Sequence, residues 1–373
     1  MRPIYLDYAA TTPVDPRVAL KMQTCLMEEG AFGNAHSLHA YGKEAKALIE
    51  AARLEVASSI HAEPSEIIWT SGATESINLA IKGVAHLYKR RGKHIVTMQT
   101  EHKATLDVCQ QLEKEGYQVT YLSPERNGVL DIEKLKLALK FDTLLISVMH
   151  VNNETGVIQD LQSIANLVGE RRILLHVDAA QSMGKVNLDV RQTPIDLLSL
   201  SAHKACGPKG MGALYLRKRP RIRVQPLIHG GGHEHGMRSG TLSTHQIVGM
   251  GEAFRIAREE RERDFQHAIC LRDQLLHGLR AIREIVLHTD LEKSVPHIVN
   301  IGFPNQLADA ILTACPMLAA STASACQGSN MDGSHVLRAM GLTQAEAKSA
   351  IRFSFGRFTS MDEINQAVRM LAV

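Results

Sequence analysis

The sequence predicts an α/β fold in which helices cover both faces of a mostly parallel sheet, with a smaller α+β domain beside it. Short apolar runs of the kind found in buried strands alternate with helical patterns through residues 45–220. This alternation stops near residue 254, where a long, charged helical pattern begins. We therefore expect a large domain over residues 16–254 and a small domain built from residues 1–15 and 255–373.

The elements of the large domain follow from their periodicity. Residues 43–60 place Ala45, Ile49 and Val56 on one stripe, which predicts an amphipathic helix, and further helices are expected after residue 72 and over residues 105–115. Strands are expected over residues 67–70, 95–98, 117–122, 144–149, 174–177 and 196–200. Because parallel strands end at one edge of a sheet, functional side chains are expected in the loops beyond that edge.

The small domain is expected to begin with a connecting helix. Residues 254–282 predict one long helix with Phe265 and Leu279 on its apolar side. Its mixed-charge run over residues 258–264, Arg-Glu-Glu-Arg-Glu-Arg-Asp, is typical of a solvated helix face. Strands of this domain are expected over residues 299–303 and 351–355.

The composition is that of a globular protein and excludes several classes. Of 373 residues, 45% are hydrophobic and 22% are charged, and the net charge is +3. Neither disorder nor direct nucleic-acid binding is therefore expected. No apolar run suggests a membrane span or a signal peptide, so we expect a cytoplasmic protein. Its six cysteines form no Cys-x-x-Cys pair and are expected to be free thiols, without a metal site.

Two side chains that follow buried strands indicate cofactor chemistry. Lys204 lies just past the apolar run 197–200, where a lysine amine can form a Schiff base, although on this tetrapeptide alone a surface lysine is the favoured interpretation. Asp178 ends another buried strand. Its carboxylate can pair with the protonated ring nitrogen of pyridoxal phosphate, or it can cap a helix.

Two further segments are expected at the same edge of the sheet. Residues 70–76, Thr-Ser-Gly-Ala-Thr-Glu-Ser, stand between a strand and a helix, which suits a phosphate because small residues expose backbone N–H groups. The structural interpretation is a capping box in which Ser71 pairs with Thr74 or Glu75, and this box and a phosphate site can exist together. His102 can stack on a flat cofactor ring or move protons, and its alternative is a purely structural role.

Taken together, these motifs resemble the class V, fold-type I pyridoxal-phosphate enzymes, and among them the cysteine desulfurases of the bacterial housekeeping type. The resemblance runs from Tyr-Leu-Asp-Tyr-Ala-Ala-Thr-Thr at residues 5–12 to about residue 371. Its eight ordered blocks are TSGATESINLAIKG (70–83), TEHKA (100–104), MHVNNETG (149–156), HVDAAQS (176–182), SAHKACGPKGMGALY (201–215), GGGHEHGMRSGT (230–241), SAC (324–326) and IRFSFGRF (351–358).

The resemblance implies how this chain would hold pyridoxal 5′-phosphate. Lys204 would bind the cofactor covalently and later move the Cα proton, His102 would stack on the ring, and Asp178 would pair with the ring nitrogen. Gln181 would hydrogen-bond the ring O3′. The implied phosphate ligands are Ala73, Thr74, Ser201 and His203, together with Thr241 reaching the phosphate of the neighbouring subunit in a homodimer.

The resemblance also implies how substrate L-cysteine would be held and attacked. Asn153 and Arg352 would bind it, with assistance from Asn34, and the Arg352 fork suits an α-carboxylate. Cys326 is the predicted nucleophile. It lies among small polar residues over 321–334, which is the composition of a mobile loop on which a thiol can ionise.

The implied reaction converts L-cysteine to L-alanine and leaves the sulfur on Cys326 as a persulfide for an acceptor protein. That acceptor is an iron–sulfur scaffold, a tRNA-thiolation protein or a DNA-phosphorothioation component. The alternatives are a selenocysteine lyase or another β-lyase on the same scaffold, and a non-catalytic sulfur-carrier or assembly subunit.

Three features depart from the pattern of relatives. Cys206 stands where relatives usually carry a large side chain, and we expect a spectator thiol, the alternative being an extra oxidation-sensitive one. His235 stands where relatives often have Arg. The chain ends at residue 373, short of the tail with which longer relatives dock scaffold proteins, so the choice among acceptors stays open.

Overall fold

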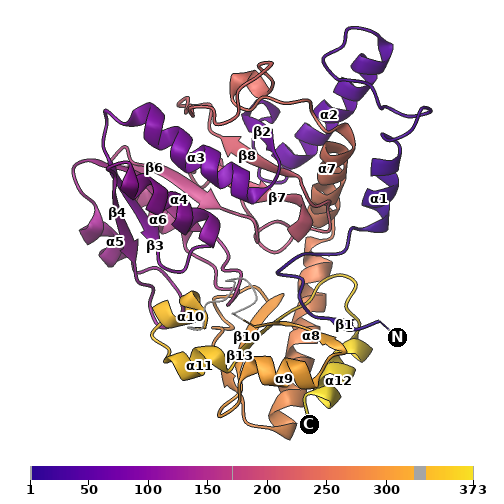
Figure 1. Cartoon of the computed structure of the whole chain (residues 1–373), viewed down its shortest axis with the longest axis vertical. Coiled ribbons are helices and arrows are strands. Elements are labelled where there is room, and N and C mark those ends of the chain that lie inside the picture. The colour runs from indigo at the N-terminus through magenta and orange to yellow at the C-terminus, as the bar shows by residue number, and fades with distance from the viewer. Residues whose placement is uncertain (1, 170, 323–332, 373) are drawn as a thin grey trace.

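The computed structural model of the chain describes residues 2–169, 171–322 and 333–372. A seven-stranded sheet forms the centre of its larger part (Figure 1). From edge to edge, its strands are β2 (Ile67–Thr70), β8 (Gly212–Leu216), β7 (Leu197–Ser201), β6 (Leu174–Asp178), β5 (Thr143–Met149), β3 (His94–Met98) and β4 (Gln118–Leu122). Strand β8 is antiparallel to β2 and β7, and the other neighbours are parallel. The predicted mostly parallel sheet is confirmed, although β8 was not predicted.

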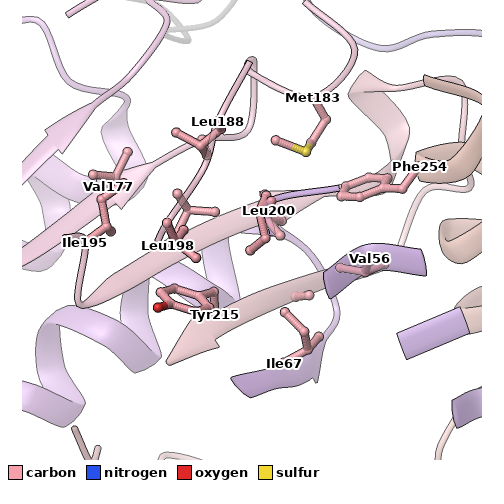
Figure 2. Close-up of a cluster of buried hydrophobic side chains, with 14 of the residues drawn as sticks. Val56, Ile67, Val177, Met183, Leu188, Ile195, Leu198, Leu200, Tyr215 and Phe254 are labelled. Atoms are coloured by element: carbon pink, nitrogen blue, oxygen red, sulfur yellow. The ribbon is translucent and has the colours of Figure 1, made fainter. Parts of the chain in front are cut away.

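Helices cover this sheet on both faces, as predicted. They are α1 (Pro16–Gln23), α2 (Ala40–Ser58), α3 (Ala73–Tyr88), α4 (Lys103–Lys114), α5 (Ile132–Ala138), α6 (Leu161–Gly169) and α7 (Thr244–Glu259). Alternate residues of a strand face opposite sides. Leu198 and Leu200 join the core under α2 and α7, next to Val56 and Phe254 (Figure 2), whereas Leu197 packs in the core that α3 and α4 cover.

Buried histidines connect neighbouring strands inside the sheet. The His176 ring on β6 lies between the hydroxyls of Ser147 on β5 and Ser199 on β7, at 2.8 and 2.9 Å. Burial lowers the pKa of His176 to about 3, so the ring stays neutral. A neutral imidazole offers one donor and one acceptor, which matches one hydroxyl on each side.

The smaller part combines the first residues of the chain with the segment from α8 to the end of the described residues. Its four-stranded antiparallel sheet has the order β12 (Ser321–Thr322), β13 (Ala350–Ser354), β10 (Ile298–Gly302) and β9 (Val286–Leu287). Strand β1 (Ile4–Tyr5) pairs with β11 (Leu318–Ala319) beside it (Figure 1). Its helices are α8 (Arg261–Ile282), α9 (Ala308–Ala314), α10 (His335–Ala339), α11 (Gln344–Lys348) and α12 (Met361–Met370). We keep the division into residues 16–254 and residues 1–15 with 255–373 as a proposal.

Two predictions about the connection between these parts are wrong. Residues 254–282 form two helices, because α7 ends at Glu259 and α8 begins at Arg261, with Glu260 outside both. The charged run at this break is not merely a solvated face, since Glu260 and Asp264 are half-buried and pair with arginines. No described helix combines the length and apolarity that crossing a membrane requires.

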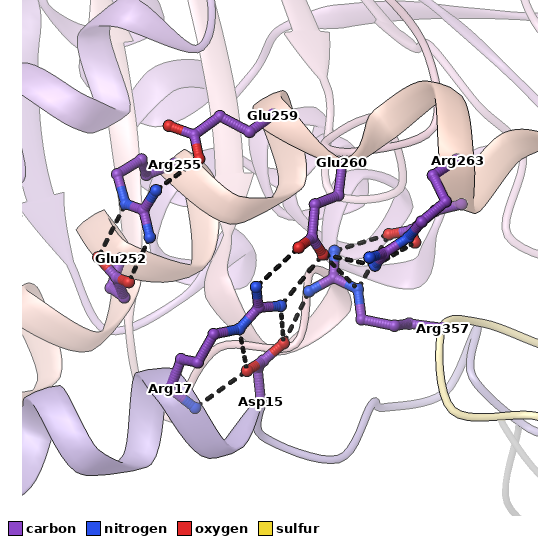
Figure 3. Close-up of polar contacts among 9 residues, drawn as sticks. Asp15, Arg17, Glu252, Arg255, Glu259, Glu260, Arg263 and Arg357 are labelled. Atoms are coloured by element: carbon purple, nitrogen blue, oxygen red, sulfur yellow. Dashed lines mark hydrogen bonds and ion pairs between the residues drawn. The ribbon is translucent and has the colours of Figure 1, made fainter.

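Two arginines and three carboxylates connect the start of α1, the start of α8 and the turn after β13 (Figure 3). Arg17 donates to Asp15 at 2.8 and 2.9 Å and to Glu260 at 2.7 Å. Arg357 donates to the same Asp15 at 2.7 Å and to Asp264 at 2.6 Å. The charged run predicted as a solvated helix face therefore contributes to a network of ion pairs between the two parts of the chain, which we call the polar joint.

The joint predicts how acid affects stability. Hydrogen bonds from Arg17, opposed in part by burial, hold the pKa of Asp15 well below its usual range. A carboxyl with a lowered pKa stabilises the fold above the unfolded pKa of about 3.9, and this contribution is lost as pH falls below that value. We expect Asp15→Asn to lower the free energy of unfolding by about 2 kcal/mol at pH 7. In urea titrations, this difference should shrink below about pH 4.

The control is Asp273→Asn on α8, because the Asp273 side chain is 57% exposed beside Arg272. An exposed ion pair of this kind contributes less than about 1 kcal/mol, so the control should unfold like the wild type. If the difference in free energy of unfolding between wild type and Asp15→Asn stayed constant from neutral to acid pH, the Asp15 charge would not be the cause of the stabilisation.

Candidate active site

A cavity of about 510 Å³ opens where the parallel strands of the large sheet end. Side chains reach it from the loops after five of these strands and from β13 of the small sheet. Ten of the predicted site residues line it: Ala73, Thr74, His102, Asn153, Asp178, Gln181, Ser201, His203, Lys204 and Arg352. The expectation that the strand-end motifs meet in space is therefore met.

Lys204 is held at the end of the short helical turn η2 (Ala202–Lys204), which continues directly from β7. Its Nζ donates to the backbone oxygens of Ala9 and Ala10 at 2.5 and 2.7 Å. The interpretation of Lys204 as a simple surface lysine is wrong, because this amine is partly buried and faces the cavity.

His102 and Asp178 both line the cavity, and the surrounding protein favours the neutral form of each. The backbone N–H of Ala104 donates to His102 Nδ1 at 3.1 Å, so the proton of the neutral ring lies on Nε2. Burial by the surrounding protein lowers the pKa of His102, which favours that neutral form. Burial raises the pKa of Asp178, and its hydrogen bond from Ala180 together with the nearby His102 and Lys204 opposes the rise. The next element after Asp178 is strand β7, with no helix between them. The predicted alternative, in which Asp178 caps a helix, is therefore wrong.

The segment after β2 offers backbone donors to the cavity. Helix α3 starts after Gly72, whose φ is +153°, and no side chain caps this helix end. The predicted capping box is therefore wrong in its detail, since Gly72 is the cap and the Ser71 N–H donates to Glu75 at 2.8 Å. The first turn of a helix has N–H groups without helical partners, so this end suits an anion.

Arg352 on β13 reaches the cavity from the small part of the molecule. It donates to the backbone oxygen of Asn153 at 2.9 Å and to Asp7 at 2.7 Å. Arg352 is 5% exposed, and its Nε has no hydrogen-bond partner among the described residues. The guanidinium is thus held in place by Asp7 and the Asn153 backbone, and it lines the cavity where a carboxylate could pair with it.

Three predicted residues do not meet the others in this cavity. Asn34 is exposed, and its side chain accepts from the His36 N–H at 3.0 Å. Thr241 is exposed in the loop before α7 and does not line the cavity of its own chain. Cys326 lies outside the described residues. Of the loop expected over 321–334, the first two residues form β12.

The N-terminal segment supplies contacts that sequence reasoning missed. The backbone of Ala9 and Ala10 binds Lys204, Asp7 holds Arg352, and the Thr11 hydroxyl lies 3.1 Å from His203 Nδ1. The adjacent small residues after strand β1 were the available signal, because they permit a close approach of backbone.

Comparison with known proteins gives the family. A family model described as aminotransferase class-V matches residues 4–367. The chain belongs to the class-V aminotransferase family. The cysteine desulfurase IscS of Vibrio cholerae serotype O1 (strain M66-2) is 55% identical to this class-V chain over 372 residues, covering 100% of it and 92% of the relative.

Solved structures agree with this assignment. A NifS-like protein matches the class-V chain with a TM-score of 0.93 and 37% identity, covering 99% of this chain and 98% of the other. SspA in complex with cysteine matches with a TM-score of 0.84 and 36% identity, covering 95% and 99%. The predicted resemblance to cysteine desulfurases and the predicted fold type I are confirmed.

The residues present fit pyridoxal 5′-phosphate, the cofactor of this family. Ser201 Oγ is buried without a hydrogen-bond partner among the described residues, beside the uncapped start of α3. Apart from Gly72 itself and its two chain neighbours, no atom of the described residues lies within 4 Å of the position that a Cβ would take on Gly72. These free donors and this open backbone suit a phosphate group, while Lys204 and Asp178 suit the aldehyde and the ring nitrogen.

Proposed function

We propose that Lys204 and Cys326 carry the two chemical steps of a cysteine desulfurase in this chain. The enzyme converts L-cysteine to L-alanine and transfers the sulfur. The observation that supports these roles is the single cavity that joins Lys204, His102, Asp178 and Arg352. This complete set argues against a non-catalytic carrier or assembly subunit.

In this proposal the carboxylate of L-cysteine binds Arg352, whose position Asp7 and the Asn153 backbone fix. Bound pyridoxal phosphate supplies an electron sink for negative charge at the substrate Cα. The Lys204 amine takes the Cα proton, and the buried Asp178 carboxylate in the same cavity would pair with the ring nitrogen of the cofactor. His102 faces the same cavity as a neutral ring with a proton on Nε2.

Cys326 then takes the sulfur. Its thiolate attacks the substrate sulfur, so an S–S bond forms and the carbon–sulfur bond breaks. The electron pair of that bond stays with the carbon fragment, which gains a proton and leaves as alanine. The persulfide on Cys326 is a reversible form of the thiol: an acceptor thiolate attacks its outer sulfur, the bond between that sulfur and Cys326 breaks, and Cys326 leaves as a thiolate.

We further propose that the enzyme acts as a homodimer. Thr241 is exposed and does not line its own cavity, which leaves it available to the cavity of a second copy. Large apolar side chains, Phe32, Leu38 and Tyr41, are 52%, 88% and 54% exposed in one segment. This segment lies close to the Thr241 loop, because His36 contacts His233 with ring centroids 4.2 Å apart. An exposed apolar patch of this kind is typical of a subunit interface.

We also propose that the sulfur passes in the cytoplasm to one of the three acceptor classes named above, an iron–sulfur scaffold, a tRNA-thiolation protein or a DNA-phosphorothioation component. Each acceptor class would receive sulfur from the same Cys326 persulfide. The chemistry inside the cavity is therefore the same whichever acceptor follows.

The test is product formation from L-cysteine with a reducing agent, measured as alanine and sulfide. Wild type is expected to form the two in equal amounts. Cys326→Ser is expected to keep bound cofactor and its colour but to lose about a hundredfold or more in rate, because a dissolved thiol lacks the proximity of a thiol carried by the chain.

Cys270→Ser is the matched control, since Cys270 is an exposed free thiol on α8 far along the chain from the cavity residues. It should behave as wild type. Equal rates for wild type and Cys326→Ser would indicate a β-lyase that does not use this thiol. Cofactor binding without alanine formation from L-cysteine, but with formation from selenocysteine, would indicate a selenocysteine lyase.

A further inference from the structure

A second lysine, Lys185, lies behind Lys204. A smaller cavity of about 50 Å³ is lined by both lysines and by Ala9. Ala9 and Lys204 also line the larger cavity, so they form the wall between the two. Lys185 therefore faces Lys204 from the side away from the substrate.

Hydrogen bonds connect the two lysines through Gln181. Lys185 Nζ donates to Gln181 Oε1 at 2.9 Å, and Gln181 Nε2 donates to the backbone oxygen of Ala9 at 2.8 Å. Lys204 Nζ donates to that same oxygen at 2.5 Å. The two contacts leave the Gln181 amide one orientation, because its oxygen must face Lys185 and its NH2 group must face Ala9. The second N–H of that group remains for the larger cavity, which Gln181 also lines.

The smaller cavity adds little negative charge to these two amines, whereas in the larger cavity Lys204 also faces the Asp178 carboxylate together with His102, His203 and Lys209. Its titratable and charged lining residues besides the lysines are Tyr8, Cys206, Asp264, His297 and Arg357. Asp264 is the one carboxylate among the described residues that line it, and Arg357 donates to it at 2.6 Å. Burial, then the nearby Lys204, lowers the pKa of Lys185. This pKa falls to about 7, so Lys185 is charged mainly below that pH, and there the same Coulomb interaction disfavours a positive charge on the nitrogen of Lys204.

We propose that Lys185 is a positioning residue for the chemistry of Lys204: it holds the Gln181 amide in one orientation and opposes protonation of the Lys204 nitrogen. This inference rests on the proposed function of Lys204. It assigns to Lys185 a charge effect and a hydrogen-bond effect, and these can be separated by substitution.

The experiment compares Lys185→Met, Lys185→Gln and Lys185→Arg in the cofactor-loaded protein without substrate. The Met variant loses both the positive charge and the hydrogen-bond donor. The Gln variant keeps a donor for Gln181 without the charge, and the Arg variant keeps the donor and the charge. The readout is the pH at which the visible cofactor band changes by half. We expect this midpoint to rise by about half a unit in the Met and Gln variants where it lies near pH 7, because Lys185 is only partly charged there. It should stay at or below the wild-type value in the Arg variant.

The hydrogen-bond effect has its own readout. Lys185→Met is expected to release bound pyridoxal phosphate about threefold faster during dialysis than Lys185→Gln, since only Gln leaves the Gln181 oxygen paired. Lys136→Met on the exposed side of α5 is the matched control for loss of a lysine charge, because its side chain is 51% exposed. Thermal unfolding of each variant checks the fold, and Lys185→Gln carries the charge test where Met fails to fold.

The outcomes separate this inference from the proposed function. Midpoints in Met and Gln within about 0.2 units of wild type, or no titration between about pH 6 and 10, would overturn the charge effect. Equal cofactor release from Met and Gln would overturn the hydrogen-bond effect. Failure of the proposed function looks different, because wild type would then form no alanine or would show no cofactor band that depends on Lys204.

Discussion

Lys204→Ala is expected to abolish the visible absorbance that pyridoxal phosphate gives when it is bound through a lysine, and with it alanine formation from L-cysteine. The substitution removes the amine that we propose to bind the cofactor covalently and to take the Cα proton. General acid–base catalysis alone contributes 10²- to 10⁴-fold, so we expect a loss of about 10⁴-fold or more. The measurement is the spectrum after dialysis against buffer and re-addition of cofactor, followed by alanine assay.

Lys204→Arg separates chemistry from folding. An arginine keeps a positive charge near the Ala9 and Ala10 oxygens that hold Lys204, but a guanidinium does not form a Schiff base. The Arg variant should therefore unfold like wild type yet lack the band and the activity. A normal band in either variant after dialysis would show that another amine binds the cofactor.

Arg53→Met is expected to cause the largest loss of stability. Arg53 on α2 and Glu234 in the turn η3 (Glu234–Gly236) form two hydrogen bonds of 2.8 and 2.9 Å, and their side chains are 9% and 3% exposed. The pair also binds the open edge of β2, since Arg53 donates to the Ile67 oxygen and the Trp69 N–H donates to Glu234. Removing one partner leaves a buried charge unpaired, which costs about 3–5 kcal/mol.

Two further variants test this interpretation. Glu50→Gln breaks the other ion pair of the same arginine, but the Glu50 side chain is 51% exposed, so less than about 1 kcal/mol should be lost. Arg53→Met combined with Glu234→Gln removes both charges and should be more stable than Arg53→Met alone. Urea unfolding can be followed through Trp69, the single tryptophan, whose ring lies 5.1 Å from the Arg53 guanidinium. If Arg53→Met lowered the free energy of unfolding by less than about 1 kcal/mol, the Arg53–Glu234 pair would contribute no more than an exposed ion pair, contrary to this prediction.

The Arg53–Glu234 pair also bears on the proposed dimer. Glu234 and His235 have positive φ angles of 51° and 58°, in the segment that leads to Thr241. Such backbone is strained for residues other than glycine, so a strong contact is needed to hold it. The buried pair supplies that contact and thereby positions the loop that we propose to serve a neighbouring subunit.

The sequence alone predicted most of the fold and ten of the cavity residues. Strand and helix periods depend on which residues along one element face the core, and that information is local. The loops after parallel strands share one edge, so His102, Asp178 and Lys204 could be grouped without a structure. Sequence reasoning failed where the outcome depended on a distant segment, as at the break at Glu260, whose side chain is drawn into an ion pair with Arg17.

The tertiary structure alone decided which remote groups complete the site. Arg352 meets Asp7 across 345 positions of sequence, and Lys204 meets Ala9 across 195. Neither contact leaves a periodic signal, because a hydrogen bond between two segments depends on how whole elements pack. Lys185 likewise gives no signal in the sequence, where it simply follows Gly184. Only packing places it behind Lys204. The sequence thus indicated which residues we propose to carry the chemistry, because strand-end motifs are local. Only the packing of the N-terminal segment and the small sheet against the large one decided how those residues are held and charged.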